Sequence, residues 1–215
     1  FTYLYEDKKT LVRSNSKLRD QLQEIENKQF LKKQNQRIAI DIINMQDRIK
    51  DLGNKRQVHV LKIASFGLKN YLCCSQHILN LQNPRQFDIA SNLPVAANKT
   101  FIGQTSQNHL NLIEVILFSD VSHILPVKIN GLHCNAQGAG KPMLARCKVN
   151  EDFKISSIYK NINVMTSGMG GIFPKDVRIG TVLSIVEVSS NEFEIEIALD
   201  GNPMDHNYFG ILVSS

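Results

Sequence analysis

The chain has 215 residues, of which 42% are hydrophobic, and a formal net charge of +5. This length permits one large domain or two small ones, and four cysteines are too few for a disulfide-stapled mini-protein. No run approaches the ~18 to 20 uninterrupted apolar residues that a membrane-spanning helix needs. No signal peptide is recognisable.

The net positive charge comes entirely from the N-terminal quarter. Residues 1–57 contain thirteen Lys or Arg and eight Asp or Glu, whereas the remainder contains twelve of each. A nucleic-acid-binding module concentrates basic charge on its folded domain. We therefore expect no nucleic-acid partner, and interpret the basic segment as a helix face exposed to solvent or lying near a membrane.

The first 52 residues are predicted to form one helix. None of the 12 Gly and none of the 6 Pro precedes Gly53, and both residue types break helices. Gly53 is placed to cap the C-terminal end of this helix. Such a helix is about 75 Å long, as expected for a spacer or stalk.

Apolar residues in this helix recur every seventh position, which predicts a coiled coil. The repeat has two blocks out of register, since the interval from Leu11 to Met45 falls one residue short of five heptads. Leu4 also fits the first block, and Asn15, Gln29 and Asn35 interrupt the pattern. A narrow apolar stripe does not stabilise a long helix alone, so we expect homodimerisation; the alternative is that the helix packs against its own domain. The predicted dimerisation seam is Leu11, Leu18, Leu22, Ile25, Leu31, Ile38, Ile42, Met45, Ile49 and Leu52.

After Gly53 the pattern changes to short apolar runs separated by turn residues, which is typical of β-barrels or sandwiches. In 192–197, Phe193, Ile195 and Ile197 alternate with glutamates, as in a half-buried strand. The predicted fold class is therefore mainly β with a long N-terminal α-helix. The expected divisions are a coiled-coil helix at 1–56, a first small barrel-like β subdomain at 57–130 and a second at 131–215, with insertion of one into the other left open.

Catalytic motifs are not recognisable. A nucleophile elbow needs Gly two residues before the serine, but Met165 precedes Ser167. The phosphate-loop pattern fails because Pro142 follows Gly140-Lys141. We predict no catalytic residues and no cofactor, and keep a chymotrypsin-like β-barrel protease with an unrecognised triad as an alternative.

The cysteines leave two interpretations open. Cys73, Cys74, Cys134 and Cys147 are interpreted first as small buried hydrophobic residues, with a Cys134–Cys147 bridge as the alternative in an oxidising compartment. His133 lies beside Cys134, but the paired C-x-x-C spacing of structural zinc sites is absent, so we predict no metal site.

The segment 165–186, which begins MTSGMGGIFPKDVRIGTV, resembles the block TSGLGG-[IV]-FP-x-G-x-P-[IV]-G-x-V typical of the MreC family. It departs from that block at Asp176, where the family usually has Gly, and at Arg178, where it usually has Pro. Weaker similarities are LPV at 93–95 followed by FIGQ at 101–104, and VILFSD at 115–120. The resemblance extends from about residue 8 to the C-terminus.

The resemblance implies a function in cell shape. MreC-like proteins have one N-terminal membrane anchor, a dimerising coiled coil and two β subdomains. The resemblance therefore implies a non-enzymatic scaffold on the periplasmic side of the cytoplasmic membrane, with a single-pass anchor upstream of Phe1. The implied partners are the elongation-specific penicillin-binding protein, MreD, MreB and RodA. A coiled-coil secretion or adhesin stalk is the other alternative, but it leaves residues 165–186 unexplained.

The Gly-rich block predicts a shaped loop between two strands, because glycines permit positive φ or close backbone approach and proline fixes φ. Ile172 and Phe173 are its expected anchors. A binding role and a purely structural role are equally compatible with the sequence, and the candidates for partner contact are exposed strand edges and apolar loop tips. The predicted loop residues are Gly168, Gly170, Gly171, Phe173, Pro174 and Gly180.

Overall fold

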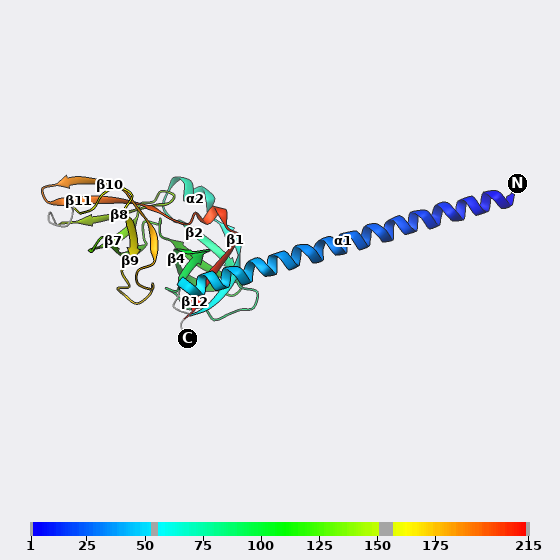
Figure 1. The fold of residues 1–215 in the computed structure, drawn as a ribbon, viewed down its shortest axis with the longest axis horizontal. Coiled ribbons are helices and arrows are strands. Elements are labelled where there is room, and N and C mark those ends of the chain that lie inside the picture. Colours follow the sequence, from blue (N-terminus) through cyan, green and yellow to red (C-terminus); the bar gives the residue numbers. More distant parts are fainter. Residues whose placement is uncertain (1, 53–55, 151–156, 214–215) are drawn as a thin grey trace. The chain divides into compact units, whose positions relative to one another are not determined.

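The computed structural model describes residues 2–52, 56–150 and 157–213 (Figure 1). The chain divides into two compact units, Phe1–Asn44 and Met45–Ser215. The first consists of most of helix α1, and the second contains all the strands. None of the described helices combines the length and apolar character needed to cross a membrane.

The predicted long helix is present as α1, Thr2–Leu52. Its sequence lacks Gly and Pro throughout, so nothing interrupts the backbone hydrogen bonding. The predicted cap at Gly53 lies outside the described residues. The seam residues Leu11, Leu18, Leu22, Ile25 and Leu31 have 53–63% of their surface exposed, so an apolar stripe on this helix is uncovered.

The last turns of α1 pack against the β region, which corrects part of the predicted seam. Ile49 is fully buried, and Met45 and Leu52 pack beside it against the same core. A Cβ on Gly210 would lie 2.5 Å from Cδ1 of Ile49, so the strand backbone directly contacts this side chain. Gln46 Nε2 also donates to the carbonyl of Val58 (3.2 Å). For these three seam residues the alternative interpretation, packing against the chain's own domain, is the correct one.

The first barrel is closed by six antiparallel strands in the order β1-β12-β3-β4-β5-β2. A short helix, α2 (Leu68–Cys73), lies between β1 and β2 in the chain. Strand β12 pairs with both β1 and β3, and so completes the barrel. The strands are β1 Gln57–Phe66, β2 Ile78–Gln82, β3 Pro94–Ala97, β4 Thr100–His109, β5 Leu112–Leu117 and β12 Tyr208–Val213.

The second barrel is inserted between β5 and β12, with antiparallel strand order β10-β11-β8-β7-β6-β9. The chain returns to the first barrel through the short 3-10 helix Pro203–Asp205. The strands are β6 Ile124–Ile129, β7 Leu132–Gly138, β8 Leu144–Val149, β9 Asn163–Thr166, β10 Arg178–Ser189 and β11 Glu192–Leu199.

The predicted fold class is confirmed, but the subdomain limits differ. The first crossing between barrels is at residues 118–123, so the expected boundary at 130 falls inside the β6–β7 hairpin. The second subdomain ends at Leu199 rather than at the C-terminus. Because both barrels are closed, the described strands also leave no continuous open edge of the kind expected for partner contact, and loop tips remain as candidates.

Along the strands, buried side chains alternate with more exposed ones. Ile195 and Ile197 of β11 are fully buried, as predicted, and each such side chain contributes about 1.5–3 kcal/mol. One buried cluster contains Ile49 of α1, Phe101 of the first barrel and Ile195 of the second barrel. The two barrels therefore share part of one core.

All four cysteines are paired, which corrects the preferred interpretation. Cys134 and Cys147 join neighbouring strands β7 and β8, with Cα atoms 6.2 Å apart, and Cys73 is bonded to Cys74 at the end of α2. The Cys134–Cys147 bridge is the alternative that the sequence left open.

Candidate functional site

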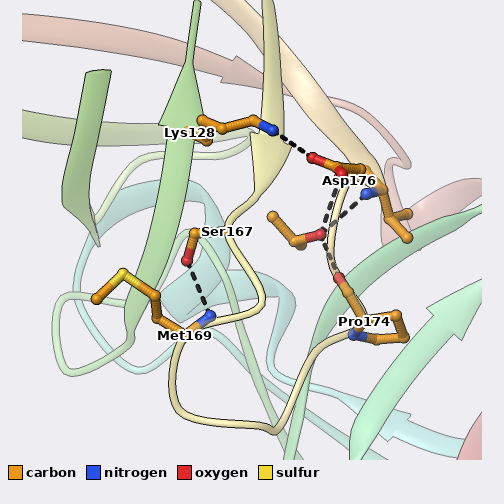
Figure 2. Close-up of polar contacts among 7 residues, drawn as sticks. Lys128, Ser167, Met169, Pro174 and Asp176 are labelled. Atoms are coloured by element: carbon orange, nitrogen blue, oxygen red, sulfur yellow. Dashed lines mark hydrogen bonds and ion pairs between the residues drawn. The ribbon is translucent and has the colours of Figure 1, made fainter. Parts of the chain in front are cut away.

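The Gly-rich loop, defined as residues 167–177 between β9 and β10, is closed at its base by Thr166. The Thr166 hydroxyl donates to the carbonyl of Pro174 and accepts from the backbone N–H of Val177 (3.0 Å). The backbone N–H of Asp176 donates to the Thr166 carbonyl (2.9 Å). Ser167 Oγ accepts from the Met169 N–H at 3.1 Å, inside the loop (Figure 2). These bonds satisfy the backbone of a segment that belongs to no sheet.

Two of the predicted glycines are required for different reasons. Gly168 has φ +76°, and a Cβ there would lie 2.8 Å from Cβ of Lys175 across the loop. Gly180 permits close approach of two strands, since its Cβ would lie 2.2 Å from the Ala198 carbonyl oxygen. Gly170 and Gly171 also have positive φ, and a Cβ at either position would meet open space.

Asp176, the main departure from the family block, has φ 62°, the left-handed conformation that suits the family's usual glycine. Asp tolerates this conformation better than most residues. Its carboxylate binds the ammonium of Lys128 from β6 (Figure 2). The hydrogen bond from Lys128 lowers the pKa of Asp176. The second departure, Arg178, pairs with Asp200 (Nε to Oδ2, 2.9 Å).

Phe173 connects the Gly-rich loop to the first barrel. Its side chain is 6% exposed and meets Phe101 of β4 and Phe118 edge-on, with ring centroids 5.4 and 5.3 Å apart. His123 contacts Phe118 in the same way (5.0 Å) and lies 6.5 Å from Phe173. We call Phe101, Phe118, His123 and Phe173 the aromatic cluster. Edge-on aromatic pairs add about 0.5–1.5 kcal/mol each beyond the burial of their surface.

A polar contact reinforces this connection. Arg56, immediately before β1, donates from Nη1 to the Ile172 carbonyl at 3.3 Å. The Ile172 carbonyl and the Phe173 ring therefore connect the loop of one barrel to residues of the other.

The crossing at residues 118–123 is fixed by the carboxylate of Asp120, which is 3% exposed. It accepts backbone N–H bonds from His77 (2.6 Å) and Ser122 (2.7 Å). Burial alone would raise the pKa of Asp120, but the bonds from Ser122 and His77 outweigh it and lower the pKa. The carboxylate therefore stays ionised and holds the segment after α2 to the crossing.

His123 is buried with neither ring nitrogen hydrogen-bonded among the described residues. Desolvation lowers its pKa to about 4, against a smaller opposing effect of Asp120. The imidazole is therefore neutral at neutral pH, which suits its buried contacts with two phenylalanine rings.

One Ser–His contact exists at the crossing, between Ser119 Oγ and Nδ1 of His77 (2.8 Å). The second ring nitrogen, Nε2, contacts the Cys74 carbonyl at 3.0 Å rather than a carboxylate. Both residues are buried, at 3% and 0% exposure, so a substrate has no access to the hydroxyl. The pair is a structural network and lacks the geometry of a catalytic triad.

Metal coordination has no geometric support in the described ranges, where no three His, Cys, Asp or Glu side chains come together. Cys134 and Cys147 are bonded to each other, so neither thiol is free to bind a metal.

The structure brings the predicted loop residues together but adds partners that the sequence did not identify. Gly168, Gly170, Gly171, Phe173 and Pro174 lie in one loop, and Gly180 lies in the following strand. Thr166, Phe101 and His123 were missed. Thr166 had a signal, because a hydroxyl residue at a strand end can bond the backbone of the next turn. No sequence pattern around Phe101 or His123 indicates that either residue packs against the loop.

Two nested, closed six-stranded barrels preceded by a long helix define a double-barrel structural protein in which a Gly-rich loop joins the barrels. The family model for rod shape-determining protein MreC, barrel core, matches residues 75–212. The chain therefore belongs to the MreC family of cell shape-determining proteins.

Individual relatives agree with this assignment. The cell shape-determining protein MreC of Haemophilus influenzae is 28% identical over 110 residues, covering 47% of this chain and 29% of that protein. The chain thus matches less than a third of that relative's length. A solved MreC structure has a TM-score of 0.70 at 16% identity, covering 83% of this chain and 98% of its own. A complex between a penicillin-binding protein (PBP2) and MreC from Helicobacter pylori matches with a TM-score of 0.51 at 18% identity, covering 74% and 100%. At these identities the two structures support the fold alone.

Proposed function

We propose that this chain is a non-enzymatic scaffold of the bacterial elongation complex. It organises peptidoglycan synthesis and maintains cell shape by binding the elongation-specific penicillin-binding protein. The observation that carries the proposal is membership of the MreC family, together with the Helicobacter pylori complex of a penicillin-binding protein with MreC.

The proposal extends to location and assembly. The protein acts on the periplasmic side of the cytoplasmic membrane, held by a single-pass anchor upstream of Phe1, and forms a homodimer through α1. MreD, MreB and RodA are its further partners. No cofactor takes part, and the burial of Ser119 and His77 is evidence against the protease alternative.

The aromatic cluster suits a scaffold because it limits motion of one barrel against the other. Phe173 packs on Phe101 and Phe118, while Arg56 bonds the Ile172 carbonyl, so the barrels are joined by side chains in addition to two chain crossings. A partner that contacts both barrels then meets a preorganised surface, and loses less conformational entropy on binding.

The test is the affinity of the periplasmic region of the elongation-specific penicillin-binding protein, from the same organism, for wild type and three variants. Phe173→Ala and the milder Phe173→Leu loosen the cluster, and we expect at least tenfold weaker binding for the alanine variant. Tyr159→Ala, at an exposed aromatic of the second barrel, is the control. Circular dichroism establishes that each variant is folded.

Three outcomes are distinct. No binding by wild type contradicts the scaffold proposal. Unchanged affinity of folded Phe173 variants removes the cluster from partner binding but leaves the scaffold in place. Loss of binding by Tyr159→Ala alone moves the contact to the exposed surface of the second barrel.

A further inference from the structure

The two disulfides differ in their access to solvent. Cys73 and Cys74 are both exposed, at the end of α2. Cys147 is fully buried and Cys134 is half-buried, so the second barrel shields the Cys134–Cys147 bridge. A thiol opens a disulfide by attacking one of its two sulfur atoms directly. Of the two bridges, Cys73–Cys74 is therefore the one open to attack from solution.

Stability does not explain the Cys73–Cys74 bridge. A disulfide stabilises a fold mainly by restricting the unfolded chain, and the effect grows with the length of the loop that it closes. Cys73 and Cys74 are neighbours in the chain, so their bridge closes almost no loop. An exposed disulfide of this kind is readily exchanged with other thiols, whereas a shielded one resists reduction. The bridge therefore suits thiol–disulfide exchange better than structural cross-linking.

The backbone of this disulfide is hydrogen-bonded to a buried histidine. Nε2 of His77 lies 3.0 Å from the Cys74 carbonyl oxygen, and His77 is 0% exposed. A carbonyl oxygen accepts only, so Nε2 carries the proton and donates to it. In the neutral imidazole Nδ1 is then an acceptor, and it accepts from the Ser119 hydroxyl at 2.8 Å. The imidazole thus links the Cys74 carbonyl to the first crossing between the barrels.

The other contacts of His77 hold it firmly at this crossing. Its backbone N–H donates to Oδ2 of Asp120 (2.6 Å), and its carbonyl accepts from the N–H of Leu117 (3.0 Å). The Ser119 carbonyl in turn accepts from the N–H of Gly140 (3.0 Å), in the loop between β7 and β8. A line of hydrogen bonds therefore runs from the disulfide through His77 and Ser119 to the second barrel.

We infer that Cys73–Cys74 is a redox-active modification site whose substrate is a dithiol, and that its reduction releases the Cys74 carbonyl from His77. A thiolate of the dithiol attacks one sulfur, forms a mixed disulfide and displaces the other cysteine as a thiolate. The second thiolate of the dithiol then attacks the mixed disulfide, so the dithiol leaves as a disulfide. Two electrons pass to the bridge, and each cysteine takes up a proton. The inference goes beyond the scaffold function and does not depend on it.

Reduction acts on the carbonyl because the closed ring restricts the backbone of Cys74. This residue has an extended conformation (φ −141°, ψ −154°) immediately after the last residue of α2. Opening the ring removes the link between the two side chains, so the backbone of Cys74 regains rotational freedom. The backbone of His77 stays fixed by Asp120 and Leu117 and does not follow. The bond from Nε2 is therefore the contact that breaks.

The first experiment measures which bridge opens first. The full chain is equilibrated at graded ratios of reduced to oxidised dithiothreitol, and in parallel with a reduced protein dithiol of the thioredoxin class. Free thiols are then blocked with maleimide and located by peptide mass. We expect Cys73 and Cys74 to be labelled together, at a ratio about tenfold or more below that needed for Cys134 and Cys147. Opening by dithiothreitol alone assigns the site to small dithiols, and opening by both reagents includes protein dithiols.

Two results of this experiment overturn the inference. One is opening of Cys134–Cys147 at the same or a lower ratio of reduced to oxidised dithiothreitol. The other is labelling of Cys73 and Cys74 before any reductant is added.

The second experiment measures the link to His77 by amide hydrogen exchange. In protein reduced only at Cys73–Cys74, we expect peptides that cover 74–78 and 118–123 to lose protection, while peptides of β11 keep it. Cys73→Ser/Cys74→Ser should match the reduced wild type with or without dithiol. The matched control, Cys134→Ser/Cys147→Ser, should still respond to dithiol. Unchanged protection of 118–123 in the reduced protein would show that the bridge does not act through His77.

Discussion

Phe173 in the loop between β9 and β10 meets Phe101 of β4 edge-on, with ring centroids 5.4 Å apart and the two planes inclined at 69°. The contact joins the residue that the family block places in a Gly-rich loop to a buried residue on a strand of the other barrel. The shape of that loop therefore has a mechanical consequence, since Thr166, Gly168 and Asp176 together present one phenyl ring at the crossing between the barrels.

Replacing Phe173 by alanine is expected to reduce stability more than any other change in the loop. Truncation of a buried phenylalanine costs about 3–5 kcal/mol, because the removed surface leaves a cavity between Phe101 and Phe118. Urea unfolding followed by circular dichroism measures the loss. Met169→Ala, 62% exposed in the same loop, is the control and should change stability by less than about 0.5 kcal/mol. Equal effects would show that the ring contributes no cross-barrel packing.

Acid is expected to destabilise the protein partly through His123. The folded pKa of His123 is lowered to about 4 from 6.5, so between these values the unfolded chain binds a proton that the folded chain does not. The contribution to stability is thus full above pH 6.5 and falls as the pH drops toward 4, by about 3 kcal/mol in total. His123→Phe should flatten this part of the stability profile relative to wild type, while His109→Gln, at an exposed position of β4, should not. Parallel profiles for wild type and His123→Phe would contradict the buried, neutral imidazole.

The two disulfides are expected to differ in their effect on stability. Cys134–Cys147 closes a loop across two strands, and loss of a bridge of this span costs about 2–4 kcal/mol because the unfolded chain gains freedom. Cys73–Cys74 joins adjacent residues and constrains the unfolded chain little. The comparison is Cys134→Ala/Cys147→Ala against Cys73→Ala/Cys74→Ala, measured by thermal unfolding under non-reducing conditions. A larger loss of stability on removal of the Cys73–Cys74 bridge than on removal of Cys134–Cys147 would contradict this expectation.

Substitutions at Asp176 should separate backbone conformation from the ion pair. Because φ is 62°, Asp176→Gly is expected to keep the loop with little loss, whereas Asp176→Ala should be less stable than both wild type and the glycine variant. Any small difference between wild type and Asp176→Gly should shrink in high salt, since it reflects the pair with Lys128. Chemical denaturation at two salt concentrations measures this, and an alanine variant as stable as the glycine variant would exclude the backbone explanation.

Local features were predictable from sequence and long-range pairings were not. The absence of Gly and Pro before Gly53 defines α1, and alternation at Ile195 and Ile197 defines β11, because both depend on neighbours within a few residues. The insertion of one barrel in the other depends on β12 pairing with β1, at the opposite end of the β region, and no turn signal encodes that choice.

In the candidate site, too, the local features were predictable from the sequence and the long-range contacts were not. Turn chemistry identified Gly168 and Phe173 as parts of a shaped loop, but nothing near Phe173 in the chain indicates that Phe101 is its partner. The heptad pattern likewise identified Ile49 as a seam residue, because an apolar stripe looks the same whether it packs on a second helix or on a barrel.

The position of β12 determines which barrel can close first. Strands β6 to β11 are contiguous in the chain, so the second barrel can close without any strand from outside 124–199. The first barrel cannot close until Tyr208–Val213 fills the space between β1 and β3. A chain that lacked Tyr208–Val213 would therefore carry a closed second barrel and an open first barrel, in which the edges of β1 and β3 are unpaired and available for aggregation or for recognition by chaperones.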